Sequence, residues 1–206
     1  GRITVLTETL MVEFDVLIEN TTIVEGTGKG AYGGSIGVKG DRIAALGEVR
    51  GDAKKVVDAK GLTAVPGFID AHSHADWTLL WYPLCESYAM QGVTTFVGGQ
   101  CGGSQGPIGE VVRLPSPLMD HLPELDPFKF YPNQPYYPLD RVNGWMKDIY
   151  GWTIDWETMG GYFRKVEEVG VSINYAPLVG HGSIRTKVMG LDYQRHSTKE
   201  EWAWMR

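Results

Sequence analysis

Two histidines in the first half of the chain have the type and spacing that suit metal chemistry. His72 and His74 lie two residues apart, just beyond the end of a predicted strand at 63–70 (TAVPGFID). Residues two apart on an extended strand point to the same face, so both imidazoles could reach one cation. The alternative is a pair of exposed histidines at the start of a loop.

Cys101 is the third candidate ligand, because it follows a β-branched run at 93–98 (VTTFVG) and lies among glycines. A thiolate is a good zinc ligand, whereas most free cysteines are small buried hydrophobic residues. The setting favours the ligand for Cys101. Cys85 has no such setting and is predicted to lie in the core. Two cysteines are too few for a disulfide framework, which favours a reducing, cytoplasmic location.

Two polar residues follow a third apolar run, at 171–179. His181 could hydrogen-bond a substrate or orient a metal-bound group, and the alternative is a histidine that caps a glycine turn. Arg185 could pair with a substrate carboxylate, and the alternative is a solvated surface arginine. Asp70 and Asp76 are near the histidines, but neither is assigned to the site; Asp76 could equally cap a helix.

The elements that would position these residues alternate between strands and helices after residue 62. Strands are predicted at 63–70, 93–98 and 171–179, and helices at 77–91, 156–169 and 197–206. The last helix would begin with a capping box of Ser197 and Glu200. This alternation is typical of a parallel α/β sheet, and in a (β/α)8 barrel the strand carboxyl ends carry the active site.

The part before residue 63 has a different pattern. Short apolar segments between 14 and 62 are separated by glycine turns, including Gly40-Asp41. This is typical of strands joined by tight turns and predicts a small β-sandwich domain. We therefore expect a β domain at 1–62 and an α/β domain at 63–206.

A long segment at about 107–152 interrupts the α/β pattern. Eight of the 11 prolines fall between Pro107 and Pro138, together with several aromatic residues. Such long loops in compact domains are usually functional. We expect this segment to lie over the carboxyl rim of the sheet, where it would shape a pocket or contact a partner, the alternative being a surface elaboration.

Length and charge limit the remaining possibilities. Only three strand–helix units fit between residues 63 and 206, whereas a (β/α)8 barrel needs about 250 residues. We therefore expect less than half of a barrel here, with the remainder supplied by a second polypeptide or by a C-terminal continuation. A net charge of −6 without a basic run argues against nucleic acid, and no apolar stretch has the length of a membrane span.

Several motifs of the chain resemble those of one known family. The segment 66–74 (PGFIDAHSH), after a β domain that ends in VVDAKG (56–61), is similar to the amidohydrolase superfamily. Three further motifs resemble its N-acyl-D-amino-acid deacylase (D-aminoacylase) branch. They are EGTG at 25–28, GVTT at 92–95 followed by QCG at 100–102, and LVGHG at 178–182 with Arg185 close behind. The resemblance covers residues 14–106 and 156–206.

The resemblance implies a fold and a metal site. The chain would be the first part of a TIM-like (β/α)8 metal-dependent hydrolase barrel, preceded by a small β-sandwich domain. His72, His74 and Cys101 would bind one or two zinc ions or another divalent metal, with Cys101 in the place of the carbamylated lysine of hydantoinase-like relatives. Further histidines and a proton-transferring aspartate would come from later strands, outside this chain.

The resemblance also implies an activity. The expected reaction is hydrolysis of a non-peptide amide bond, most simply that of an N-acyl amino acid, by metal-activated water. His181 would be a catalytic residue and Arg185 a substrate-binding residue of this site. A cyclic amide or imide hydrolase, similar to hydantoinase or dihydroorotase, is one alternative. A non-catalytic scaffold subunit is another, although the intact ligand set argues against it.

Overall fold

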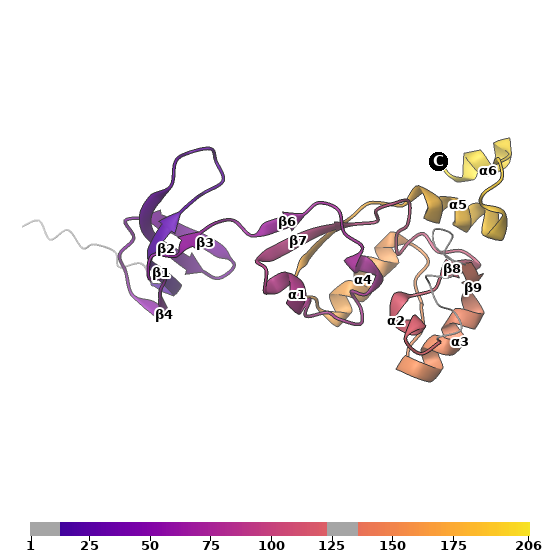
Figure 1. Cartoon of the computed structure of the whole chain (residues 1–206), viewed down its shortest axis with the longest axis horizontal. Coiled ribbons are helices and arrows are strands. Elements are labelled where there is room, and N and C mark those ends of the chain that lie inside the picture. Colours follow the sequence, from indigo (N-terminus) through magenta and orange to yellow (C-terminus); the bar gives the residue numbers. More distant parts are fainter. Residues whose placement is uncertain (1–12, 123–135) are drawn as a thin grey trace, which may run out of the picture. The chain divides into compact units, whose positions relative to one another are not determined.

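The computed structural model of the chain describes residues 13–122 and 136–206. The chain divides into two compact units, residues 1–66 and 67–206, which are described separately (Figure 1). Predictions that involve residues 123–135, including part of the proline-rich segment, lie outside the described residues. In the described part of the chain, no helix is long and apolar enough to cross a membrane.

The first unit is built on one five-stranded sheet. Its strands are β1 (Phe14–Ile23), β2 (Tyr32–Lys39), β3 (Arg42–Gly47), β4 (Ala53–Asp58) and β5 (Thr63–Ala64). Their order is β3-β2-β1-β4, and β5 also pairs with β1. The predicted tight turn at Gly40-Asp41 is confirmed, and Gly40 has a φ of 59° that an L-residue rarely adopts. Phe14 lies buried against Gly37, where a side chain would collide with its ring.

The predicted strand at 63–70 is divided between the two units. Its first two residues, Thr63 and Ala64, pair with β1 in the first unit. Its last three form β6 (Phe68–Asp70), which pairs with a strand of the second unit. Pro66 lies between them and has no N–H to offer to a ladder, which explains the break. Along the chain, the boundary between the units therefore falls between Pro66 and Gly67, four residues beyond the boundary predicted at 62/63.

The second unit contains a parallel sheet of three strands. The strand β7 (Val93–Gly98) lies between β6 and β10 (Asn174–Pro177), and both neighbours run parallel to it. The prediction of a parallel α/β arrangement is confirmed, and β7 has the predicted bounds. β10 is shorter than the predicted 171–179, because Ser172 donates its N–H to Pro83 rather than to the ladder. All three strands point toward the helix α5 (His181–Met189) (Figure 1).

One face of this sheet is covered and the other is open. Phe96 stacks on Tyr175 in the sheet, and Tyr175 meets Tyr162 of the helix α4 (Met159–Val169) edge to face. On the opposite face, Ile69 is 66% exposed. Phe68 beside it is also largely exposed, so the edge strand β6 presents apolar surface to solvent.

The predicted helix at 77–91 is wrong. The structure has a short 3-10 helix η1 (Ala75–Trp77), a series of turns, and a four-residue helix α1 (Glu86–Ala89). Pro83 lacks the N–H that an α-helix needs, and Cys85 has a left-handed φ of 45°. Pro83 and the left-handed Cys85 therefore prevent this segment from forming one continuous helix.

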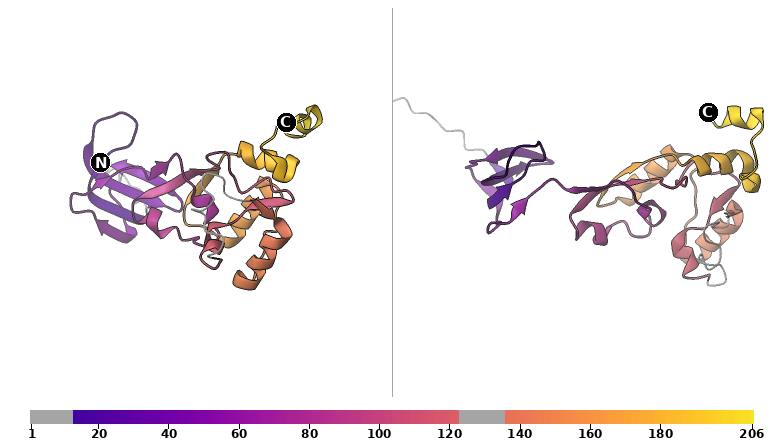
Figure 2. Two further views of the ribbon diagram at one scale, coloured as in Figure 1. Left: turned by 45° about the vertical axis from the view of Figure 1, so that its right-hand side comes forward. Right: turned by 45° about the horizontal axis from the view of Figure 1, so that its top comes forward.

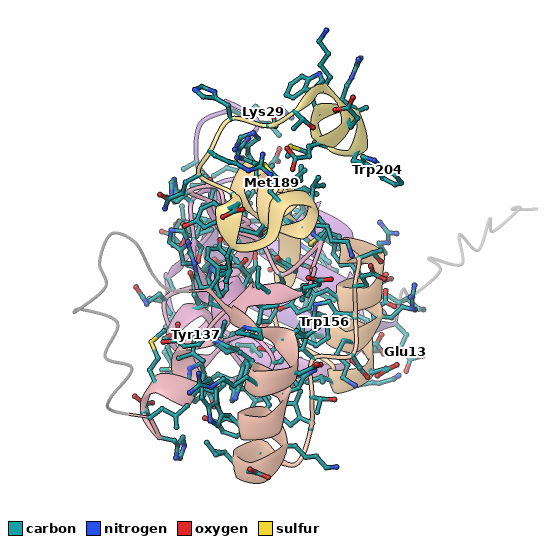
Figure 3. All side chains as sticks on the ribbon, turned by 90° about the vertical axis from the view of Figure 1, so that its right-hand side faces the viewer. Glu13, Lys29, Tyr137, Trp156, Met189 and Trp204 are labelled. Carbon is teal, nitrogen blue, oxygen red and sulfur yellow. The ribbon has the colours of Figure 1, made fainter. Side chains whose placement is uncertain are left out.

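The proline-rich segment, predicted as a long loop, contains regular structure. Its described elements are β8 (Val111–Arg113), α2 (Ser116–Met119), β9 (Tyr136–Pro138) and α3 (Leu139–Tyr150), and β8 pairs antiparallel with β9. Leu118, Val142 and Met146 are fully buried in the same core as Trp156 and Tyr162. Figure 3 draws the described side chains on the ribbon, with Tyr137 and Trp156 labelled. The described part of the segment lies beside α5, which contacts β8 (Figure 2), and it forms part of the body of the unit.

The last helix is α6 (Lys199–Trp204), and its N-cap, Thr198, lies one residue later than the predicted Ser197. Its capping box uses Thr198 and Glu201 instead of Ser197 and Glu200. The Thr198 hydroxyl accepts from the Glu201 N–H at 3.2 Å, and the Glu201 carboxylate accepts from the Thr198 N–H at 2.8 Å. Glu201 also pairs with Arg195, which favours this register over the other.

Candidate metal centre

His72, Cys101 and His181 each follow a different strand of the parallel sheet. His72 and His74 follow β6, Cys101 follows β7, and His181 is the first residue of α5 after β10. Because the strands are parallel, their carboxyl ends lie at one edge of the sheet. The residues predicted from their spacing therefore occupy the rim where barrel enzymes carry their active sites.

The structure brings His72, His74 and Cys101 together. One ligand atom from each lies within 4.8 Å of the others, and all three side chains are exposed. The thiol sulfur of Cys101 is 3.5 Å from Nε2 of His72. Two ligands of one tetrahedral zinc, a nitrogen and a sulfur, are about 3.5 Å apart at usual bond lengths. The donor set and the distance between Cys101 and His72 therefore fit a zinc-type ion.

The turn that carries Cys101 is unusual in its backbone. Gly99, Cys101 and Gly102 all have left-handed φ values, of 73°, 53° and 80°. Glycine adopts this conformation freely, but an L-residue such as cysteine loses about 1–2 kcal/mol there. Gly99 is also pressed against Leu178, whose carbonyl oxygen would be 1.9 Å from an added Cβ. This strained turn presents the thiol of Cys101 to solvent beside His72.

Ser73 anchors the loop that carries the two histidines. Ser73 is buried between its two exposed neighbours and donates its N–H to Val97 of β7. Its hydroxyl contacts the hydroxyl of Tyr88, which also donates to Asp70 at 2.9 Å. Asp70 in turn accepts from the N–H of His72 at 3.2 Å. Burial raises the pKa of Tyr88, so its phenol stays protonated and available as a donor.

Asp76 links this loop to the turn after β7. It is 1% exposed and lies within η1, so it is not the helix cap that the sequence left open. Its Oδ2 atom accepts from the N–H of Gly99 at 3.2 Å, and its backbone carbonyl accepts from the Tyr162 hydroxyl at 3.1 Å. Burial raises the pKa of Asp76 to about 6. Its contacts fix the base of the Cys101 turn.

His181 and Arg185 lie on α5, outside the group of three ligands. His181 is exposed at the amino end of the helix. The guanidinium of Arg185 donates from Nε to the carbonyl of Tyr193 at 2.8 Å and from Nη2 to that of Arg195 at 2.5 Å. These bonds use two of its five N–H groups. Arg185 therefore holds the segment after α5, and the structure places no acidic group beside it among the described residues.

The remaining predictions about single residues can be compared directly. Cys85 is buried, as predicted for a core cysteine, and its thiol donates to the carbonyl of Tyr82 at 3.4 Å. The two remaining histidines, His121 and His196, are exposed. The sequence did not point to Tyr88 as a residue that supports the histidine loop. The alternation His-Ser-His was the available signal, since it places Ser73 inward when the histidines face out.

The comparison with protein families identifies the chain. Residues 55–199 match the model of the amidohydrolase family. The chain therefore belongs to the amidohydrolase family.

Comparison with individual proteins narrows the resemblance. The chain is 34% identical over 193 residues to the N-acyl-D-aspartate deacylase of Alcaligenes xylosoxydans xylosoxydans, covering 93% of this chain and 33% of that protein. A D-aminoacylase structure, from work on its binuclear metal centre, aligns with a TM-score of 0.69 at 29% identity, covering 93% of this chain and 34% of that one.

A second structure agrees. The N-acyl-D-glutamate deacylase of Bordetella bronchiseptica, complexed with zinc and a phosphonate inhibitor, aligns with a TM-score of 0.68 at 29% identity, over 94% of this chain and 35% of that one. The predicted resemblance to the D-aminoacylase branch is thus confirmed. The mixed α/β fold matches the amino-terminal part of D-aminoacylase, and the chain spans about a third of the length of these relatives.

Proposed function

We propose that this chain contributes to an N-acyl-D-amino-acid deacylase, a metal-dependent hydrolase of the amide bond of N-acyl amino acids. The observation that carries the proposal is the convergence of His72, His74 and Cys101 within 4.8 Å at the carboxyl rim of the sheet. The similarity to deacylases of N-acyl-D-amino acids supports the substrate class.

His72, His74 and Cys101 would hold a zinc-type ion. When bound, such an ion supplies a Lewis acid that polarises the scissile carbonyl and lowers the pKa of water. The three side chains are exposed, so an ion held by them would be open to substrate from solvent. Ser73 and Asp76 keep the two ligand loops in register with each other, because the histidine loop hydrogen-bonds both Val97 of β7 and Gly99 in the turn that carries Cys101.

His181 would contact the substrate from α5. Its ring is exposed on the same rim, and an imidazole N–H there can donate to the oxygen of the scissile amide. Arg185 would bind the substrate carboxylate with the N–H groups that the carbonyls of Tyr193 and Arg195 leave over. The two residues lie one turn apart on α5, a separation at which helix side chains share a face.

The complete site would lie in a TIM-like (β/α)8 barrel. The parallel order β10-β7-β6 and the open face of the sheet, on which Ile69 is exposed, support this, because a closed barrel would cover that face. The strands missing here would come from a C-terminal continuation or a second polypeptide, and would carry the later histidines and the aspartate. The sheet of the first unit would form part of a β-sandwich.

The test is an assay of the complete natural polypeptide that contains this chain. We expect zinc to co-purify, a chelator to abolish amine release from N-acetyl-D-amino acids, and added zinc to restore it. N-acetyl-L-amino acids and hydantoins are the comparison substrates. Ring opening of hydantoins without turnover of N-acyl amino acids would replace the proposal by a cyclic amide hydrolase. Full metal loading without turnover of any amide would favour a scaffold role.

A further inference from the structure

A buried pair of serines joins the loop after β7 to the helix α5. Ser104 and Ser183 are 6% and 7% exposed. The hydroxyl of Ser183 accepts from the N–H of Ser104 at 2.9 Å and donates to the carbonyl of Ser104 at 3.1 Å. One side chain thus satisfies both backbone groups of the other residue, across a separation of 79 positions in the sequence.

The hydroxyl of Ser104 completes the connection. It accepts from the N–H of Gly180 at 2.9 Å and donates to the carbonyl of Gly106. Each of the two hydroxyl groups therefore donates once and accepts once. Buried polar groups that are fully satisfied in this way fix one arrangement, because any shift leaves a buried group without a partner.

The backbones on either side of the serines are in direct contact. The N–H of Ser183 donates to the carbonyl of Gly102 at 3.1 Å. A Cβ added to Gly180 or to Gly182 would lie 2.5 Å or 2.6 Å from that same carbonyl oxygen. The approach is therefore possible only without side chains at these glycines. Gly102 is the neighbour of Cys101 in the chain, and Gly182 is the neighbour of His181.

We infer that Ser104 and Ser183 are positioning residues that set the place of His181 relative to Cys101. The inference rests on the proposed function, in which these two residues serve one site. The serines contact neither substrate nor metal ligand themselves; they act through the backbone on both sides. Their effect is on catalytic geometry, because a misplacement of about 1 Å can lower a rate about a hundredfold.

The first test replaces one hydroxyl in the complete natural polypeptide. Ser183→Ala leaves the N–H of Ser104 without an acceptor, and we expect kcat to fall about tenfold to a hundredfold with KM nearly unchanged. Ser172→Ala, a loss of an exposed hydroxyl that bonds a backbone carbonyl, is the control. Ser172 also donates its hydroxyl to a backbone carbonyl, that of Leu84, but it precedes the amino end of β10. We expect its kcat to equal that of the wild type.

A double-mutant cycle separates positioning from general damage. If Ser183 acts through His181, then Ser183→Ala will lower kcat in the wild type but not in a His181→Ala background. An equal loss in both backgrounds would overturn the inference. The thiolate-to-cobalt charge-transfer band of the Co²⁺ enzyme should persist in Ser183→Ala, since Cys101 stays in place; loss of that band would also overturn it.

Amide hydrogen exchange tests the pair without any variant. In the metal-loaded wild type, the N–H groups of Ser104 and Gly180 should exchange slowly and with matching protection factors, because the same pair protects both. Exchange of Ser104 at the rate of an exposed loop would overturn the inference even if no variant folds. A protein that hydrolyses no N-acyl amino acid would remove the proposed function, and this exchange measurement would still decide whether the pair exists.

Discussion

Cys85 and Cys101 have the same side chain and nearly the same left-handed backbone, with φ values of 45° and 53°. Cys85 is 8% exposed, its thiol donates to the carbonyl of Tyr82, and burial raises its pKa. Cys101 is exposed, 3.5 Å from an imidazole nitrogen of His72. Two cysteines with nearly the same backbone conformation thus have different surroundings. Whether the thiol faces the core or the solvent-exposed His72, and not the turn itself, determines what it can bind.

The largest expected effect comes from removing the exposed thiol. Cys101→Ala deletes a proposed metal ligand, and we expect zinc content after dialysis to fall and kcat/KM to drop at least about a hundredfold. Cys85→Ala should keep both quantities at the wild-type level. Elemental analysis and initial rates on the complete polypeptide measure them. A Cys101→Ala protein that retains full zinc would contradict the assignment of Cys101 as a ligand.

A second effect concerns the histidine beside Cys101. His72→Ala removes the group 3.5 Å from the sulfur, and we expect zinc affinity to fall about tenfold or more. His121→Ala is the control, because His121 is exposed but outside the group of three ligands. Competition with a chromogenic chelator gives both affinities. Equal affinities in the two variants would contradict the assignment of His72.

Thiol labelling distinguishes the cysteines more gently. In the metal-free protein at neutral pH we expect iodoacetamide to modify Cys101 first, and zinc to protect it. Cys85 should react only after unfolding or at clearly alkaline pH, since burial raises its pKa and the thiolate is the reactive form. Peptide mapping by mass spectrometry reads both sites. Equal labelling at neutral pH would erase the distinction.

The smallest effect is on stability. Cys85→Ala should lower the free energy of unfolding by about 1 kcal/mol at neutral pH, through lost burial. The folded pKa of Cys85 is raised, so its contribution is complete below the unfolded value of about 8.5 and is lost as the pH rises through the folded value. Urea titrations should therefore show that the difference in free energy of unfolding between wild type and Cys85→Ala becomes smaller at alkaline pH. A difference that grows with pH would contradict the raised pKa of Cys85.

Some of this molecule follows from local sequence. The strand at 93–98 could be predicted to the residue, because a β-branched run is bounded by Gly92 and Gly99, both of which have left-handed φ values. The three residues that the structure groups together, His72, His74 and Cys101, could be chosen from spacing and family resemblance. The capping box could not be placed, because Ser197 with Glu200 and Thr198 with Glu201 satisfy the same pattern, and the structure, in which Arg195 pairs with Glu201, uses the second.

Other features depend on contacts between distant parts of the chain. The buried residues of α3, Val142 and Met146, have the four-residue spacing of a helix. The prolines that precede them led us to predict a loop there instead. Cys85 adopts a left-handed backbone that is incompatible with the predicted helix at 77–91. A cysteine in the sequence gives no indication of this conformation. The bonds between Ser104 and Ser183 join residues that no local pattern connects.

The open edge strand β6 has a practical consequence for anyone who produces this chain alone. Phe68 and Ile69 expose apolar side chains, and among the described residues β6 has β7 as its one strand partner. Unpaired edges with apolar surface recruit further chains through backbone hydrogen bonds and cause aggregation. We expect the isolated chain to accumulate in inclusion bodies, and its solubility during co-expression with later strands to report directly whether those strands cover β6.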